Sequence, residues 1–125
     1  MKNIRFFKCN VCGAVDAEFF DGKGERVCCG KPMTELTANT SDGATEKHLP
    51  VITRDGDKVT VTVSTVEHPM LSEHYIAFIV VVHGNKLQKV ALVPGEKPQA
   101  TFTVPADEVV VAYEYCNIHG LWTAQ

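Results

Sequence analysis

Residues 48–125 alternate between short apolar segments and turn signals, a pattern typical of β-strands. In residues 58–65 three valines alternate with threonine and serine, as a strand with one buried face requires. The Asp55-Gly56-Asp57 turn before it predicts a hairpin with residues 51–54. Further strands are predicted over residues 74–82, 86–93, 100–104 and 109–115. Because no helical periodicity separates these segments, we predict an immunoglobulin-like antiparallel β-sandwich of roughly seven short strands.

The first third of the chain has a different pattern, in which cysteines and glycines replace the alternating valines. The sequence CNVC at residues 9–12 is a Cys-x-x-Cys pair, and VCCGKP supplies the adjacent thiols of Cys28 and Cys29. Residues 14–27 predict two short strands around an Asp-Gly-Lys-Gly turn, which would fold the second cysteine pair back onto the first. Adjacent cysteines need a twisted backbone to reach one metal, because neighbouring side chains of an extended chain point apart.

Four thiolates that meet in this way form a closed tetrahedral site, which suits either zinc or a single iron. We call this group the tetracysteine site; its members are Cys9, Cys12, Cys28 and Cys29. The spacing leaves both metals open, and a pair of disulfides is a third interpretation. The chain is therefore predicted to be mainly β, with a metal-binding module over residues 1–36, a polar linker over residues 37–47 and the sandwich over residues 48–125.

Composition and charge exclude several classes of function. The chain has 125 residues, 45% of them hydrophobic, and a formal net charge of −3. This suits a folded protein, and no basic stretch would follow a phosphate backbone, so we predict no nucleic-acid partner. No apolar segment has the length of a membrane span or of a secretory leader, so we predict no membrane association and a cytoplasmic location. In that reducing compartment clustered cysteines favour a metal over disulfides.

Four histidines and the fifth cysteine lie at strand ends that should meet. If successive strands are antiparallel, His48 precedes the first strand, His68 follows the second and His74 opens the third, all at one end. The sixth strand returns to that end and delivers Cys116 and His119. Metal sites are commonly built on loops at the end of a rigid sandwich. We therefore predict that these five residues form a second metal site, which we call the rim site.

The number and type of donors in the rim site indicate its metal. Five nitrogen and sulfur donors exceed the four that zinc prefers and suit a redox metal such as iron, with one position open for substrate. Beside the first ligand, Lys47 could attract a small anion, and Glu46 could ligate the oxidised metal or help to displace product. Considered alone, this pair is more simply a solvated ion pair at the end of a linker. His83, at the opposite end of the sandwich, is predicted to be an ordinary surface residue.

These segments together resemble a known family. EKHLP at residues 46–50, EHP with His68, SEHY with His74, and CNIHG with Cys116 and His119 resemble the active-site segments of the superoxide reductases. The two cysteine pairs resemble the desulforedoxin-like module of the two-iron subfamily, desulfoferrodoxin. The resemblance extends over essentially the whole chain. It implies a non-haem iron enzyme that reduces superoxide to hydrogen peroxide with one external electron and releases no dioxygen.

The resemblance also implies a role for each candidate residue. The four histidines of the rim site would be equatorial ligands of one iron and Cys116 its axial ligand, while the tetracysteine site would bind a second iron. Glu46 matches the residue that closes the sixth position in the oxidised resting state. Lys47 matches the residue that steers superoxide and supports protonation of the product. The electron donor would be rubredoxin or a similar protein, and members of this family are commonly homodimers.

Two functions from other classes fit parts of the same pattern. A cupredoxin-like electron carrier also has a cysteine followed closely by a histidine in a late loop, but no methionine follows His119 and two histidines would be left over. A zinc-stapled binding module would use the tetracysteine site alone. The metal content distinguishes the three, because the reductase should hold about two irons per chain, the carrier copper and the module zinc.

Overall fold

The protein consists of strands and turns throughout the residues that the computed structural model describes, which are 4–40, 48–64 and 68–125. It divides into two compact units, Lys2–Thr37 and Ala38–Gln125. In the described part of the chain there is no helix that could cross a membrane. The predicted fold class, a small cysteine-rich metal module followed by an antiparallel β-sandwich, is confirmed.

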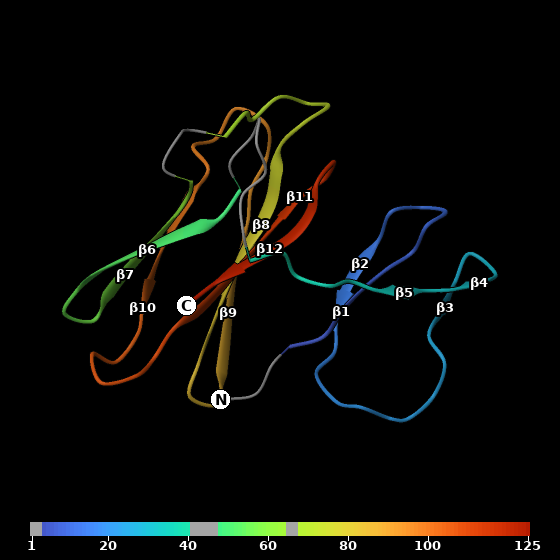
Figure 1. The fold of residues 1–125 in the computed structure, drawn as a ribbon, viewed down its shortest axis with the longest axis horizontal. Helices are drawn as coiled ribbons and strands as arrows, with labels where there is room; N and C mark the ends of the chain where they lie inside the picture. Colours follow the sequence, from blue (N-terminus) through green and yellow to red (C-terminus); the bar gives the residue numbers. More distant parts are fainter. Residues whose placement is uncertain (1–3, 41–47, 65–67) are drawn as a thin grey trace. The chain divides into compact units, whose positions relative to one another are not determined.

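The smaller unit contains two small sheets (Figure 1). In the three-stranded sheet, β1 (Phe6–Lys8) lies between β2 (Val15–Ala17) and β5 (Thr34–Glu35), while β3 (Val27–Cys28) pairs only with β4 (Lys31–Pro32). All of these pairs are antiparallel. The strands have two or three residues each, so a unit of this size gains little from sheet formation and needs other stabilising interactions.

The predicted pairing within residues 14–27 is wrong, because β2 pairs with β1 and β3 pairs with β4. Ion pairs hold the segment between β2 and β3 instead: Glu18 contacts the guanidinium groups of both Arg5 and Arg26. Arg26 also lies 4.1 Å from the centre of the Phe7 ring, a cation–π contact. These contacts replace the expected hairpin ladder.

The turn between β3 and β4 aims the two adjacent cysteines at one site. Its residues Cys29 and Gly30 have φ angles of +52° and +74°. Two consecutive left-handed residues form the tight connection that short antiparallel strands favour. The twist that neighbouring cysteine ligands require is therefore provided by this turn.

The larger unit is a sandwich of two antiparallel sheets (Figure 1). One sheet has the order β10 (Gln99–Thr103), β7 (Lys58–Val63), β6 (Pro50–Asp55), and the other the order β12 (Gly120–Ala124), β11 (Val111–Cys116), β8 (Ile76–His83), β9 (Lys86–Ala91). Six of these strands match predicted segments to within two residues at each end. The seventh, β12, was not among the predicted segments because its sequence GLWTA has no clear alternation.

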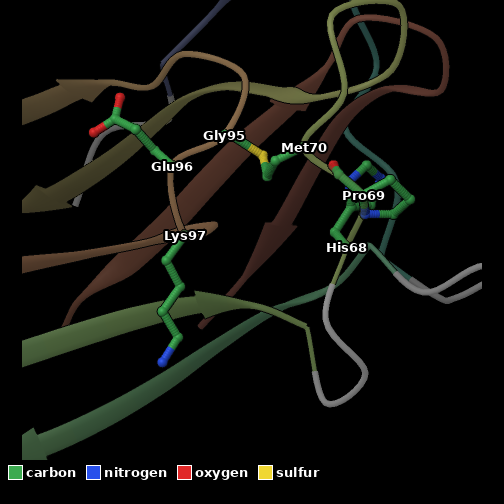
Figure 2. Close-up of a pocket in the computed structure, with 6 residues that line it drawn as sticks. All are labelled: His68, Pro69, Met70, Gly95, Glu96 and Lys97. Carbon is green, nitrogen blue, oxygen red and sulfur yellow. The ribbon is translucent and has the colours of Figure 1, made fainter.

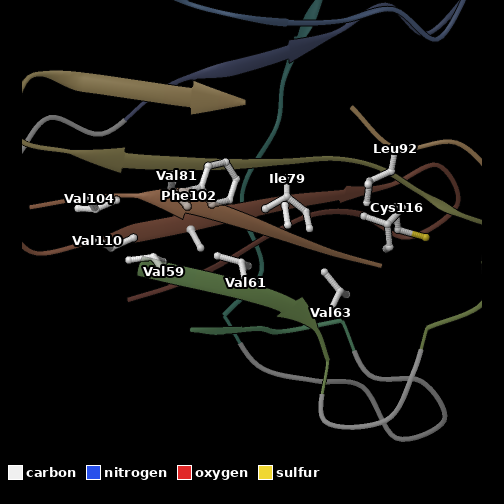
Figure 3. Close-up of a cluster of buried hydrophobic side chains, with 13 residues drawn as sticks. Val59, Val61, Val63, Ile79, Val81, Leu92, Phe102, Val104, Val110 and Cys116 are labelled. Atoms are coloured by element: carbon white, nitrogen blue, oxygen red, sulfur yellow. The ribbon is translucent and has the colours of Figure 1, made fainter. Parts of the chain in front are cut away.

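The core lies between the two sheets (Figure 3). Val59, Val61 and Val63 of β7 are fully buried, as their alternation predicts, and pack in one cluster with Ile79 and other residues of the facing sheet. Burial of each such side chain contributes about 1.5–3 kcal/mol. Cys116 lies at one end of this apolar cluster and is itself completely buried. The core therefore extends to the cysteine of the rim site.

His83 is buried, which corrects the prediction that it is a surface residue. Its Nδ1–H donates to Glu108 Oε1 at 2.7 Å, and its Nε2 accepts from the Gln88 amide at 3.0 Å. The same amide donates to the backbone oxygen of Thr103 at 2.9 Å. Because both ring nitrogens are satisfied, burial of this polar ring carries little penalty.

The hairpin turns at Gly56 and Gly84 provide a matched test of this network. Both glycines have left-handed φ angles, +61° and +54°. Gly56→Ala should lower the free energy of unfolding by about 1–2 kcal/mol, because alanine is strained in that conformation. Gly84→Ala should cost at least about 1 kcal/mol more, since the new Cβ would lie 2.8 Å from Glu108 Oε2 and displace the carboxylate from His83. Urea unfolding measures both values, and equal losses would contradict this account.

Candidate metal sites

The sulfurs of the tetracysteine site converge on one point. All four lie within 4.8 Å of one another, with separations of 3.7 Å between Cys12 and Cys28 and 4.0 Å between Cys28 and Cys29. A tetrahedral ion with metal–sulfur bonds of about 2.3 Å requires sulfur–sulfur distances of about 3.8 Å. None of the five cysteines, all of which lie in the described residues, forms a disulfide. The geometry and chemistry of these donors therefore fit a tetrathiolate metal ion.

The four thiols differ in environment and in acidity. Cys9 is buried, and the backbone N–H groups of Cys12 and Val11 donate to its sulfur at 3.4 Å, which lowers the pKa of Cys9 to about 6. The pKa of Cys28 is raised to about 12 by hydrogen bonds with Cys9 and Cys12 that favour its protonated form. The pKa of Cys29 is also raised, chiefly by its interaction with Cys12. Without a metal, this site therefore retains protons that metal binding must release.

Metal binding at the tetracysteine site should weaken steeply as the pH falls. At neutral pH the raised pKa values keep Cys28 and Cys29 protonated, so each bound ion releases at least these two protons. Two released protons correspond to an apparent affinity about a hundredfold higher for each pH unit of increase. Competitive titration with cobalt(II), followed by thiolate-to-cobalt absorption at about pH 6.5 and 7.5, measures this slope. An affinity that is the same at both pH values would contradict it.

The rim site collects side chains from three places along the sandwich sequence. His48 lies two residues before the start of β6, His68 and His74 lie between β7 and β8, and Cys116 ends β11. One donor atom from each of these four residues lies within 4.8 Å of the donor atoms of the others. The antiparallel order of the strands thus brings them together, as the parity of the strands predicts.

His119 lies against this group, in the turn between β11 and β12. Its Nδ1 is 3.1 Å from Nε2 of His48 and 3.9 Å from Sγ of Cys116. Its ring centroid is 5.1 Å from that of His74. Two imidazole nitrogens at 3.1 Å attract one another only with a proton or a cation between their lone pairs. A metal ion shared by these residues would satisfy this requirement.

Contacts outside the donor set orient two of the histidine rings. The Nδ1–H of His68 donates to the Pro69 carbonyl at 2.7 Å, which leaves Nε2 as the nitrogen that can bind a metal. Trp122 stacks on His48 with ring centroids 4.7 Å apart, and its Nε1–H donates to the backbone oxygen of His119 at 3.2 Å. Sequence reasoning did not identify Trp122, although it is the chain's single tryptophan and lies three residues after a predicted ligand.

Burial shows which side of the rim site faces solvent. Cys116, His48 and His68 are 0%, 2% and 3% exposed, whereas His74 is half-buried and His119 is exposed. A small molecule would therefore approach beside His74 and His119. The four imidazoles and one buried thiol fit a redox metal of the iron type, because five nitrogen and sulfur donors exceed the four that zinc prefers.

The other predicted site residues, Glu46 and Lys47, lie outside the described residues. A separate pocket of about 480 Å³ lies beside His68 (Figure 2). It is lined by His68, Pro69, Met70, Gly95, Glu96 and Lys97. The carboxylate of Glu96 and the ammonium group of Lys97 point in different directions. The pocket therefore adjoins one predicted ligand but does not concentrate charge of either sign.

Comparison with known proteins places this fold and these two sites in a family. Residues 40–125 match the desulfoferrodoxin family and residues 2–36 match the desulfoferrodoxin N-terminal domain. The chain is 46% identical over 119 residues to a desulfoferrodoxin homolog of Archaeoglobus fulgidus, covering 95% of this chain and 94% of that protein. It is 37% identical over 108 residues to a superoxide reductase of Pyrococcus horikoshii, covering 72% of this chain and 94% of that protein.

A solved structure shares almost the whole architecture. The crystal structure of the superoxide reductase from Treponema pallidum matches with a TM-score of 0.84 and 30% sequence identity, covering 98% of both chains. The fold and the two sites define a class of protein: a β-protein with two metal sites, the tetracysteine site and the rim site. The chain belongs to the desulfoferrodoxin family. Its four-cysteine and four-histidine–one-cysteine sites match two iron ions per chain.

Proposed function

We propose that this chain is a superoxide reductase, which reduces superoxide to hydrogen peroxide at the rim site with one external electron per turnover. The observation that carries the proposal is the convergence of four imidazoles and one thiol at one end of the sandwich, with the side beside His74 and His119 open to solvent. The family fold and the superoxide reductases of similar sequence and structure support it. Neither a copper carrier nor a zinc module accounts for the complete donor set.

The reaction consumes one superoxide, one electron and two protons and forms one hydrogen peroxide. Iron bound at the rim site would supply the redox-active centre that delivers the electron. The protein's part is to hold the donors: the buried Cys116 keeps its sulfur away from water, and the hydrogen bond from His68 to Pro69 O fixes that imidazole as a neutral ligand. The exposed side leaves room for a diatomic anion and for water that can supply protons.

Glu46 and Lys47 complete the proposal. We assign Lys47 to attraction of the superoxide anion and to support of proton delivery, and Glu46 to binding of the oxidised metal through its carboxylate. Their place in the sequence, immediately before the predicted ligand His48, supports these roles. A positive side chain beside an open metal position raises the local concentration of an anionic substrate.

We further propose that a small one-electron carrier such as rubredoxin reduces the rim site, that the chain acts as a homodimer and that it works in the cytoplasm. Support comes from the family and, for the compartment, from the five cysteines, none of which forms a disulfide. A carrier is needed because each turnover consumes one electron.

Lys47→Ala should slow superoxide reduction by about tenfold at low ionic strength, because one steering charge beside the open position is lost. The ionic-strength dependence of the rate should also become flatter, while iron content stays unchanged. Lys58→Ala is the control, since it removes the same charge at the hairpin turn where β7 begins, away from His68. Pulse radiolysis gives the rates. Wild-type kinetics for Lys47→Ala, or equal slowing by both variants, would remove Lys47 from this role.

The products distinguish reduction from dismutation. Anaerobically reduced protein should form one hydrogen peroxide for each superoxide consumed and release no dioxygen. Stopped-flow mixing with a known amount of superoxide, followed by peroxide and oxygen assays, measures both yields. Release of about one dioxygen for every two superoxide ions is the stoichiometry of dismutation and would contradict the proposed function.

Cys116→Ser removes the single sulfur donor of the rim site and should abolish superoxide reduction in the same assay.

A further inference from the structure

Asn117 links the segment that carries His74 to the turn that follows Cys116. Its side-chain Oδ1 accepts a hydrogen bond from the Tyr75 backbone N–H at 2.9 Å. Its Nδ2 donates to the backbone oxygen of Glu73 at 3.1 Å. Its own backbone N–H donates to the Tyr75 oxygen at 3.2 Å. One residue therefore holds the chain on both sides of His74.

The backbone of His74 itself is held by two hydrogen bonds to Leu71. The Leu71 N–H donates to the His74 oxygen at 2.9 Å, and the His74 N–H donates to the Leu71 oxygen at 3.1 Å. Both hydrogen bonds lie in the segment between β7 and β8, which has no regular strand structure at these residues. Together with Asn117 they constrain the backbone of three consecutive residues, so the position of the His74 ring depends on these hydrogen bonds.

Regular sheet pairing ends before this link, with the pair of Cys116 and Ile76. The register between β8 and β11 shifts at Tyr115 and Cys116, where Tyr115 pairs with Phe78 but Cys116 pairs with Ile76. Such a bulge interrupts the ladder and redirects the side chains beside it. The side chain of Asn117 continues the connection beyond the bulge, between the segments that carry two of the predicted ligands.

Only a side chain with both a donor and an acceptor can make these contacts. A carboxamide provides an oxygen for the Tyr75 N–H and an N–H for the Glu73 oxygen. Aspartate of the same shape would keep the first contact but place a negative oxygen against the Glu73 carbonyl. Alanine would remove both side-chain contacts and leave the backbone one.

We propose that Asn117 is a positioning residue of the rim site, which fixes His74 relative to Cys116 so that both can bind one metal ion. This goes beyond the assignment of the ligands, and it rests on the proposed function only in taking His74 and Cys116 as ligands of the same iron. It requires neither superoxide as substrate nor any role for Lys47. Asn117 acts through the backbone of Glu73 and Tyr75 and does not itself bind the metal.

The test compares Asn117→Ala with Gln88→Ala in the full chain. Gln88 is the matched control because its amide also makes two hydrogen bonds, to His83 and to the Thr103 oxygen. It pairs with Val81, five residues along β8 from the Ile76 that pairs with Cys116, which corresponds to about 17 Å. Both variants should lose thermal stability. Only Asn117→Ala should affect the rim site.

Three properties are measured for each variant: iron affinity, the charge-transfer band and amide hydrogen exchange. Iron affinity at the rim site should fall about tenfold to a hundredfold in Asn117→Ala and stay unchanged in Gln88→Ala. The sulfur-to-iron charge-transfer band of the oxidised rim site should shift only in Asn117→Ala. In metal-free protein the Tyr75 amide should lose its protection against hydrogen exchange in Asn117→Ala alone. Asn117→Asp should change the affinity and the band in the same direction, which keeps the test decisive if the alanine variant does not fold.

Wild-type affinity and an unshifted band in both Asn117 variants would overturn the proposal, and so would equal effects of Gln88→Ala. These outcomes differ from failure of the proposed function. If wild-type protein showed no sulfur-to-iron band at the rim site, the metal centre itself would be wrong. If the band were present but superoxide were not reduced, the function would be wrong and Asn117 would still position the ligands.

Discussion

The packing of β7 against the facing sheet is the constraint on which the rim site depends. The valines of β7 are buried against Ile79 and its neighbours, and a slip of one residue in the pairing of β7 would turn them all to solvent. This register fixes where β7 ends and β8 begins, and with them His68 and His74. The pairing of β11 with β8 then brings Cys116 to the same end. The hydrophobic core thereby sets the positions of a polar site whose members are far apart in sequence.

The two metal sites obtain their stability and chemistry in different ways. The smaller unit has strands of two or three residues and an ion-paired cluster around Phe7, so a bound metal ion is expected to contribute a large share of its stability. Its four sulfur donors make a closed site without an open position. The rim site rests on a finished β-sandwich, surrounds one buried sulfur with imidazoles and has an exposed side. The first arrangement suits a structural or electron-storing ion, and the second suits a reaction with a small molecule.

Much of the fold and of the candidate site could be predicted because the signals were local and repeated. Alternating valines located β7, and counting antiparallel strands brought His48, His68, His74 and Cys116 to one end. The pairing of β3 with β4 was not predicted because it depends on a left-handed turn at Cys29 and Gly30, which leaves no alternating pattern in the sequence. The burial of His83 depends on Glu108, twenty-five residues away, and on Gln88. The roles of Trp122 and Asn117 were not predicted, because a stacking ring and a loop hydrogen bond leave no periodic pattern in the sequence.

The central claim is that Cys116 serves a different metal ion from the other four cysteines, as the single sulfur among nitrogen donors. Iron-edge X-ray absorption on protein with both Cys9 and Cys12 replaced by serine tests it most directly, because the tetracysteine site is then removed and only rim-site iron contributes. The account predicts one sulfur scatterer and a shell of imidazole nitrogens around the remaining iron. A spectrum with no sulfur neighbour, or with two or more, would contradict it.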